Sequence, residues 1–338
     1  MEQKRVLSGI QPTGQMHLGN YFGAVRNYVA LQEKHRCFYS VVDYHAITMP
    51  YDVVKLRQNT WDLVFSLLAV GVDPENLFIQ SMVPEHTELG WIFNCFCSVG
   101  RLTNMTQYKD KSIKAAETTK ESFISAGLLD YPVLQAADIL IYRAHYVPIG
   151  KDQTQHLELT REIAQRFNHQ VRKEYFVTPE SIFTESANIR STADPDRKMS
   201  KSAGEKHFIG LFSEESRIRK QIKSAVTDTG HSVEGEMSAG VANLFEMLKA
   251  SEQNPEALIQ LTDDFNQGKL RYSDLKTTVA DAIVELVRPF QERKKELLSD
   301  KRAVKDQIKA SSRKIRETAQ ETIREVKDLL GLLNVKGV

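Results

Sequence analysis

The sequence predicts an α/β protein, with a doubly wound parallel sheet followed by a mostly helical C-terminal region. Short β-type runs alternate with amphipathic helical stretches in the first 207 residues, which is the pattern of parallel strands joined by helices. Beyond Phe208 the helical periodicity continues, and no clear strand pattern follows. The chain of 338 residues is long enough for one large or two ordinary domains with a sizeable core.

The predicted strands are short apolar runs bounded by turn residues, and they cover residues 5–7, 37–42, 77–80 and 146–149. Apolar side chains recur at helical spacing over 21–34, 53–70 and 154–166, and a further helix is predicted from Tyr131 to Tyr142. The segment 178–196 contains two prolines and many small polar residues, so it is predicted to be a loop. Ligands of such sheets bind beyond the carboxyl ends of the strands.

Residues 89–105, LGWIFNCFCSVGRLTNM, form an apolar stretch with almost no polar face. A helix that is apolar nearly all round is buried, either in a core or against another subunit. Both alternatives stay open here. The three cysteines of the chain fit neither a disulfide framework nor a zinc spacing, which favours a reducing compartment. We expect Cys95 and Cys97 to be small buried apolar residues.

The C-terminal region is predicted to contain helices over 213–224, 241–249, 275–289 and 301–330. The last of them has an apolar stripe that predicts packing against another element; it consists of Val304, Ile308, Ile315, Ala319, Val326 and Leu330. These patterns divide the chain into a sheet-containing domain at 1–207, a helical domain at 208–295 and a C-terminal helix at 296–338. We expect that helix to pack back on the body of the protein.

The charge balance and the N-terminal sequence limit the classes of protein to which this chain can belong. Lys and Arg number 45 against 44 Asp and Glu, so a nucleic-acid partner would have to bind a local basic patch. The N-terminal residues MEQKRVLSGI lack the apolar core of a secretion signal, and no apolar run reaches membrane-spanning length. We therefore expect a soluble cytoplasmic protein.

Residues 6–20, VLSGIQPTGQMHLGN, form the first candidate site. The end of a buried strand leads into a glycine-containing turn, and His17 to Asn20 open the following helix. Such a turn brings free backbone N–H groups and the positive end of a helix dipole to one point, which favours phosphate. Gly19 has no side chain, so a flat ring can lie against its backbone. Taken alone, this is also the first turn of many parallel sheets.

Residues 198–202, KMSKS, form the second candidate site. Two ammonium groups and two hydroxyls within five residues suit a phosphate chain, although most such runs are solvated charged loops. A third candidate is the pair Gln135 and Asp138, which lie three apart on one face of a predicted apolar helix. A buried carboxylate needs a partner, so the pair is either satisfied within the protein or faces a ligand. We favour the ligand.

Together, HLGN at 17–20 and KMSKS at 198–202 resemble the two signatures of class I aminoacyl-tRNA synthetases, in which a HIGH-type tetrapeptide and a KMSKS loop enclose ATP. Asn20 replaces the second histidine of the tetrapeptide. The segments SGIQPTG, VVDYHAIT, MTQYKDKS, YPVLQAADILIY and PIGKDQTQHLELTR are similar to those of bacterial tryptophanyl-tRNA synthetases. This resemblance is strong over 6–228 and weaker towards the C-terminus.

The resemblance implies a Rossmann-like catalytic domain over 1–207 and a helical anticodon-binding domain over 208–295. It implies that His17, Lys198 and Lys201 are catalytic. The residues implied to contact ATP are Gln11, Pro12, Thr13, Gly19, Asn20, Gly150, Lys151, Asp152, Ile189, Lys198, Met199, Ser200, Lys201 and Ser202. Those implied to surround tryptophan are Leu7, His45, Tyr131, Gln135, Asp138 and Gln153. The family commonly has glutamate where Lys151 stands and often has methionine where Gln135 stands.

The implied activity is that of a tryptophan–tRNA ligase, which makes tryptophanyl-adenylate and pyrophosphate from L-tryptophan and ATP and then transfers tryptophan to the 3′ end of tRNA(Trp). Positioning and charge neutralisation would carry the first step. His17 can hold phosphate oxygens, and Lys198 and Lys201 can meet the charge growing on pyrophosphate. Mg²⁺ would enter as the ATP complex, with no metal site on the protein. The family also implies a homodimer, for which residues 89–102 are a candidate interface.

Three alternatives remain. Tyrosine-specific enzymes of this class typically have a tyrosine and an aspartate around a GFDPT-like turn, where this chain has Leu7 and Gln11. A nucleotidyltransferase of the same fold that acts on smaller substrates would not need the helical region after Phe208. An inactive RNA-binding or regulatory relative is disfavoured by the intact His17, Asp138 and motif lysines.

Overall fold

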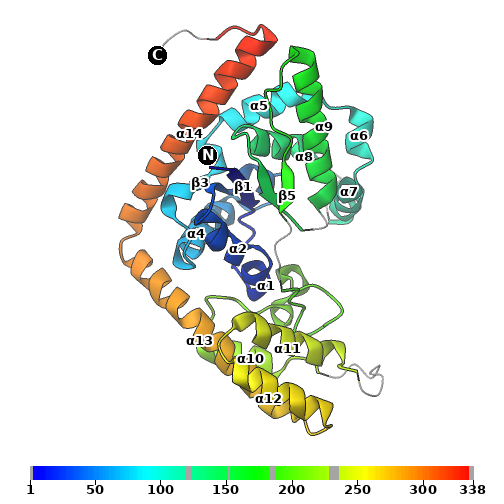
Figure 1. The fold of residues 1–338 in the computed structure, drawn as a ribbon, viewed down its shortest axis with the longest axis vertical. Coiled ribbons are helices and arrows are strands. Elements are labelled where there is room, and N and C mark those ends of the chain that lie inside the picture. Colours follow the sequence, from blue (N-terminus) through cyan, green and yellow to red (C-terminus); the bar gives the residue numbers. More distant parts are fainter. Residues whose placement is uncertain (1–2, 119–123, 151–152, 183–186, 228–235, 335–338) are drawn as a thin grey trace.

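The computed structural model describes residues 3–118, 124–150, 153–182, 187–227 and 236–334. Its N-terminal part is built on a five-stranded sheet, and its C-terminal part is a group of helices that two long helices join to the side of the sheet (Figure 1). The predicted fold class is confirmed: an α/β protein with a Rossmann-like parallel sheet and a mostly helical C-terminal region.

All strands of the sheet run parallel, and their order across it is β3-β2-β1-β4-β5. They are β1 (Arg5–Ile10), β2 (Arg36–Val41), β3 (Leu77–Ile79), β4 (Tyr146–Pro148) and β5 (Glu180–Ile182). The chain moves outward from β1 to β3 and then returns to the other side of β1 to form β4 and β5. The strand order therefore reverses between β1 and β4, and ligands of doubly wound sheets bind at such a point.

Helices connect these strands and cover both faces of the sheet. They are α1 (Leu18–Asn20), α2 (Arg26–Gln32), α3 (Asp43–Ala46), α4 (Val53–Ala69), α5 (Glu85–Asn94), α6 (Val99–Thr103), α7 (Thr106–Thr118), α8 (Ala126–Leu140) and α9 (Thr154–Val171). Alternate strand residues point to opposite faces. Val6 and Tyr39 belong to the core beneath α2 and α4, whereas Leu7 and Phe38 belong to the core shared with α5, α8 and α9.

The C-terminal helices are α10 (Glu215–Lys223), α11 (Ala239–Ser251), α12 (Pro255–Asn266), α13 (Tyr272–Ser299) and α14 (Lys301–Leu330). Helices α10 and α11 pack on α13, which also contacts α4. Lys294 of α13 reaches Asp62 of α4, with Nζ 2.6 Å from the carboxylate oxygen. The buried residues of α10 to α13 and of the start of α14 form one continuous hydrophobic core with those beneath α2 and α4, whereas the rest of α14 packs on the other core. A boundary near Phe208 thus divides two arrangements of elements that share a core, and it stays a prediction.

Helix α14 lies along the edge of the sheet beside β3 (Figure 1). Its predicted apolar stripe is buried except for the partly exposed Leu330. Two of its serines bond to the backbone of the edge strand: Ser311 Oγ donates to the carbonyl of Leu77 (2.9 Å), and the N–H of Ile79 donates to Ser312 Oγ (3.4 Å). An open edge strand invites pairing with another chain. Helix α14 therefore shields the edge strand β3 from pairing with another chain.

Three predicted elements differ from the structure. Strand β5 lies inside the segment predicted to be a loop, because three residues are too few to show an alternating pattern. Helix α8 begins at Ala126 rather than at Tyr131, since Ser125 caps it by accepting the N–H of Leu128 (3.1 Å), and Pro132 lies within the helix. A π-helical turn, Tyr21–Val25, interrupts the helix predicted over 21–34.

Residues 89–105 are not one buried helix. Helix α5 ends at Asn94 and α6 begins at Val99, and Trp91 and Val99 are 74% and 68% exposed. Cys95 is exposed and Cys97 is partly exposed, so the prediction that both are buried is wrong. Leu89 and Phe93, one turn apart, face the core while Trp91 and Cys95 face outward. The hydrophobic pattern could not show this because both faces are apolar.

No helix in the described part of the chain is long and apolar enough to cross a membrane.

Candidate active site

A cavity of about 400 Å³ lies at the carboxyl ends of β1 and β4, where the strand order reverses. The ends of both strands line it with backbone, and α3 and α8 supply side chains. The predicted site residues that line it are Leu7, Gln11, Thr13, Asn20, His45, Tyr131, Gln135, Asp138, Gly150 and Gln153. The fold thus gathers residues from distant parts of the sequence around one space.

The turn after β1 and the start of α1 form one end of this cavity. Gly14 has a φ of +106°, a conformation that favours glycine. His17 caps α1, because its Nδ1 accepts the N–H of Asn20 (3.3 Å) while Asn20 Oδ1 accepts the N–H of His17 (3.2 Å). This reciprocal cap fixes the imidazole and satisfies backbone donors at the helix start. Asn20, which replaces a histidine of the family pattern, is therefore part of the structure of the turn.

The segment that follows the KMSKS loop pairs with the start of α1. The N–H of Leu18 donates to the carbonyl of Ile209 (3.0 Å), and the N–H of Leu211 donates to the carbonyl of Met16 (2.9 Å). His17 and Gly210 form an antiparallel bridge between them. These backbone bonds hold the two motifs together, although they lie far apart in the sequence.

The loop itself comes closest to the turn at Gly19. A methyl group on Gly19 would lie 3.1 Å from the His17 ring and 3.2 Å from Met199 Cβ. A methyl group on Gly14 would lie 3.7 Å from Lys201 Nζ, so this ammonium group stands beside the glycine turn. Ile189 is buried behind the loop, where its carbonyl accepts the N–H of Met199 (3.3 Å).

We call this region, residues 11–20 with 198–202, the phosphate end of the site. Burial, followed by the charges of Lys201 and Lys198, lowers the pKa of His17 to about 4, so the ring is neutral at pH 7. Burial also lowers the pKa of Lys201, and the negative charge of Asp62 partly offsets this shift. Within the described residues, neither lysine forms an ion pair. Ammonium groups, hydroxyls and a helix N-terminus with no ion-paired carboxylate suit an anion such as a phosphate chain.

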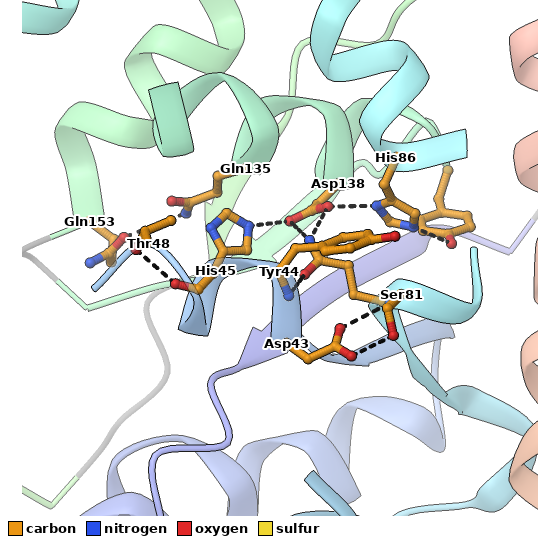
Figure 2. A network of polar contacts seen from close by, with 11 residues as sticks. Asp43, Tyr44, His45, Thr48, Ser81, His86, Gln135, Asp138 and Gln153 are labelled. Carbon is orange, nitrogen blue, oxygen red and sulfur yellow. Dashed lines mark hydrogen bonds and ion pairs between the residues drawn. The ribbon is translucent and has the colours of Figure 1, made fainter. Parts of the chain in front are cut away.

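The opposite end of the site, which we call the Asp138 end, is a buried network (Figure 2). Asp138 Oδ2 lies 2.7 Å from His45 Nε2, and Oδ1 lies 2.5 Å from His86 Nδ1. Gln80 Nε2 lies 2.8 and 3.0 Å from the two oxygens. Burial raises the pKa of Asp138, but the charge and hydrogen bond of His45, then the hydrogen bond and charge of His86, bring it down to about 2. The carboxylate is ionised and accepts from all three side chains.

The sequence left open whether Asp138 is satisfied within the protein or faces a ligand, and the structure shows both features. Asp138 is 3% exposed and fully hydrogen-bonded, yet it also lines the cavity. Its predicted partner Gln135 points towards Gln153, with Nε2 3.5 Å from Oε1 (Figure 2). An amide pair therefore lies beside the carboxylate.

Tyr131 belongs to a second polar group at the same cavity. Its hydroxyl lies 2.9 Å from His156 Nε2 and donates to Gln107 Oε1 (3.2 Å). Burial raises the pKa of Tyr131 to about 12, so the hydroxyl keeps its proton. Gln107 lies in a segment that the family resemblance had marked, but its position in the cavity was not predicted.

The remaining predicted residues fall into two groups. Pro12 is buried in the turn, and Lys198, Ser200 and Ser202 lie on the loop, with the two serine hydroxyls 2.8 Å apart. Lys151 and Asp152 lie outside the described residues. Within the described ranges, no group of three or more His, Cys, Asp or Glu side chains could hold a metal ion.

Comparisons with known proteins agree with this geometry. The chain matches the model of the family "tRNA synthetases class I (W and Y)" over residues 1–288. It is 45% identical over 341 residues to tryptophan–tRNA ligase 2 of Streptomyces avermitilis, and the match covers 99% of each chain. Nearly the whole chain thus has counterparts in a named relative.

Two crystal structures are similar over nearly the whole chain. That of tryptophanyl-tRNA synthetase from Mycoplasma pneumoniae has a TM-score of 0.85 and 34% identity, over 98% of this chain and 99% of that one. That of the Campylobacter jejuni enzyme, complexed with ADP and tryptophan, has a TM-score of 0.83 and 35% identity, over 97% of this chain and 100% of that one. The motifs, the parallel sheet and these matches lead to one conclusion: the chain belongs to the class I tRNA synthetases of the tryptophan and tyrosine (W and Y) family.

Proposed function

We propose that this protein is a tryptophan–tRNA ligase, which forms tryptophanyl-adenylate from L-tryptophan and ATP and then transfers tryptophan to the 3′ end of tRNA(Trp). The observation that carries the proposal is the arrangement of the cavity. The turn after β1 lines one end of a cavity of about 400 Å³, and an ionised buried carboxylate lines the other. His17 and the lysines of the KMSKS loop do not line the cavity themselves, but Lys201 stands beside the turn at Gly14. Relatives named tryptophan–tRNA ligase at up to 45% identity support it.

In the first step, a carboxylate oxygen of tryptophan attacks the α-phosphorus of ATP, and the bond to pyrophosphate breaks. Pyrophosphate leaves with the electron pair of that bond, so negative charge grows at the leaving group. Lys201 beside Gly14, together with Lys198, is placed to meet this charge, and Mg²⁺ bound to ATP shares it. His17, neutral and fixed by its cap, offers its ring to phosphate oxygens. In the second step, the tRNA 3′ end displaces AMP from the carbonyl carbon.

At the other end, we propose that Asp138 accepts the indole N–H of tryptophan. Leu7, which is apolar and lines the cavity, covers the ring. Because the oxygens of Asp138 already accept from three side chains, the indole would share Oδ2 with His45 or take its place. His45 lines the cavity, while the other donors approach from the protein interior.

This arrangement favours tryptophan over the closest alternative, tyrosine. Tyrosine also offers a donor, so Asp138 alone cannot reject it. Leu7 and Gln11 stand where tyrosine enzymes have polar partners for the phenol, and Leu7 offers none. A buried polar group left without a partner is costly, so phenylalanine would be rejected strongly, by about 10⁴-fold or more.

Further parts of the proposal concern partners and domains. We propose residues 1–207 as the catalytic domain, 208–295 as the anticodon-binding domain and the C-terminal helix as a brace on the sheet. Helix α13 continues to Ser299, so the last division fits Asp300 better than 295. We also propose a cytoplasmic homodimer. The exposed Trp91 on α5 supports a subunit interface, and light scattering should report twice the chain mass of 38.5 kDa.

The test of the activity is ATP–pyrophosphate exchange with tryptophan, tyrosine and phenylalanine, followed by charging of tRNA(Trp). We expect exchange with tryptophan far above that with the other two, and loss of this preference in Asp138→Ala. Preference for tyrosine would contradict the proposed substrate. Exchange without charging of any tRNA would favour a nucleotidyltransferase that acts on another substrate, and the absence of exchange would favour an inactive relative.

A further inference from the structure

His86 is a completely buried histidine that does not line the cavity. It lies on α5, is 0% exposed, and points one edge of its ring towards Asp138 (Figure 2). Its Nδ1 is 2.5 Å from Asp138 Oδ1, and its Nε2 is 2.8 Å from the Tyr142 hydroxyl. Because it cannot touch a ligand in the cavity, any effect on substrate must pass through Asp138.

The chemistry of these three groups fixes the direction of each hydrogen bond. An ionised carboxylate only accepts, so His86 must carry a hydrogen on Nδ1. Burial raises the pKa of Tyr142 well above its usual range, with the nearby Asp138 and Glu85 carboxylates adding to the effect, so its hydroxyl keeps its proton. In neutral His86, Nε2 is then the acceptor of that hydrogen. Tyr142 thus selects the tautomer of His86 that donates to Asp138.

Gln80 holds the same carboxylate from a second direction, and its own orientation is also fixed. The backbone N–H of Tyr44 donates to Gln80 Oε1 (3.1 Å), which turns the Nε2 of this amide towards Asp138. His86 and Gln80 are therefore both oriented by partners behind them. His45 differs, since it approaches Asp138 from the side of the cavity.

We propose that His86, oriented by Tyr142, is a positioning residue for amino-acid recognition and holds the Asp138 carboxylate in the orientation that receives the indole N–H. This inference rests on the proposed function and goes beyond it. Without the His86 donor, Asp138 would be free to turn towards Gln80 or to take up a proton. Either change would weaken acceptance of a hydrogen bond from the cavity. Losing one charge-assisted hydrogen bond from the network corresponds to roughly 10- to 100-fold in affinity.

The test pairs two substrates with two variants. The substrates are tryptophan and its benzothienyl analogue, in which sulfur replaces the indole N–H and the ring shape is nearly kept. His86→Asn keeps an amide donor near the position of Nδ1, whereas His86→Gln carries its amide near the position of Nε2. Exchange kinetics with each substrate give the ratio of kcat/KM for tryptophan over the analogue, and the KM for ATP reports on the phosphate end.

We expect a native ratio well above one, a fall of about tenfold or more in His86→Gln, and near-native behaviour in His86→Asn, with the KM for ATP unchanged. Tyr142→Phe, which keeps the ring and removes only the hydroxyl, should move the ratio in the same direction by less. It serves as the test if His86→Gln does not fold.

The outcomes separate this inference from the proposed function. If the native chain shows no tryptophan-dependent exchange, the proposed function fails. If it exchanges tryptophan but the native ratio is near one, Asp138 does not read the indole hydrogen; this inference and the proposed indole contact then fail, while the proposed ligase activity stands. If His86→Gln slows both substrates equally and leaves the ratio unchanged, His86 supports only the fold.

Discussion

The two ends of the cavity use similar side chains in opposite ways. At the phosphate end, His17 lies beside two lysines, and no described carboxylate pairs with them. At the Asp138 end, two histidines and a glutamine surround one carboxylate, and every donor is matched to an acceptor. The phosphate end therefore has an excess of positive charge, whereas at the Asp138 end the one carboxylate is matched by its hydrogen-bond donors.

The difference shows how a single site can handle two chemically unlike substrates. A phosphate chain is multiply charged, so a region that lacks anions gains most by binding it. An indole is neutral and offers one hydrogen, so it is best selected by an acceptor whose orientation is fixed in advance. Variants should therefore act on one substrate at a time, according to the end that they alter.

The largest effect is expected at the loop. Lys201→Ala should lower the rate of adenylate formation by at least ~10²-fold, because it removes the preorganised charge that we propose meets the leaving pyrophosphate. Tryptophan binding, measured by equilibrium titration, should change little. Lys206→Ala, which removes an exposed lysine nearby, is the control and should be near native. A loss confined to tryptophan affinity would show that the two ends are not separate.

A smaller effect is expected from Asp138→Asn, which keeps the size of the side chain and removes its charge. The amide can no longer accept from both histidines and Gln80, so we expect tryptophan to lose roughly 10- to 100-fold in kcat/KM. The KM for ATP should stay within about twofold of native. Steady-state exchange at varied ATP and tryptophan checks both values, and an equal rise in both KM values would contradict the comparison.

Gly19→Ala should raise the KM for ATP and leave tryptophan binding unchanged. The added methyl group would crowd the His17 ring at 3.1 Å and Met199 at 3.2 Å, so the loop must shift away from the turn. Crowding of this kind costs about 1–3 kcal/mol, and the lower end of that range, expected where a loop can move, corresponds to roughly 5- to 10-fold in the KM for ATP. Gly23→Ala is the matched control, since a methyl group there meets nothing within 4 Å. Equal effects of the two substitutions would remove the assigned role of Gly19.

The smallest effect concerns stability and pH. The pKa of His17 is about 4 in the folded chain, below its usual value of 6.5, so the fold favours the neutral ring. The resulting stability is fully present above pH 6.5 and declines as the pH falls towards 4. His17→Asn keeps a capping side chain but does not titrate. Between pH 7 and 6, urea unfolding should show the native chain losing more stability than this variant, by less than about 1 kcal/mol. Identical losses would mean that His17 is not held neutral.

Sequence patterns predicted the residues of the phosphate end because its parts are local, and the structure brings these residues together. That they bind phosphate stays a prediction. The turn, the helix start and the KMSKS loop are each continuous, and their residue types already indicate a phosphate site. Most of the predicted tryptophan-site residues also line the cavity. Sequence patterns did not predict the pairing of Leu18 with Ile209, which follows the loop, because backbone hydrogen bonds leave no trace in side-chain identity.

The Asp138 end was predicted only in part. Asp138 and His45 were expected there, but Gln80 and His86 were not, because they lie 58 and 52 residues from Asp138 in the chain. A buried histidine on an apolar helix gives no local signal of its partner. The exposure of Trp91 was not predicted for a related reason. When both faces of a helix are apolar, the sequence does not show which face is buried.

The packing of α14 on strand β3 has a consequence for folding during translation. The serine that bonds to Leu77 lies 234 positions later in the chain, so β3 is synthesised long before its cover exists. Domains generally begin to fold from the N-terminal side during translation. A sheet that forms on the ribosome would carry an open edge until the last helix emerges. Translation that stops before Ser311 would therefore release a chain with an adhesive strand, and a truncated product of this kind is a candidate for aggregation and degradation.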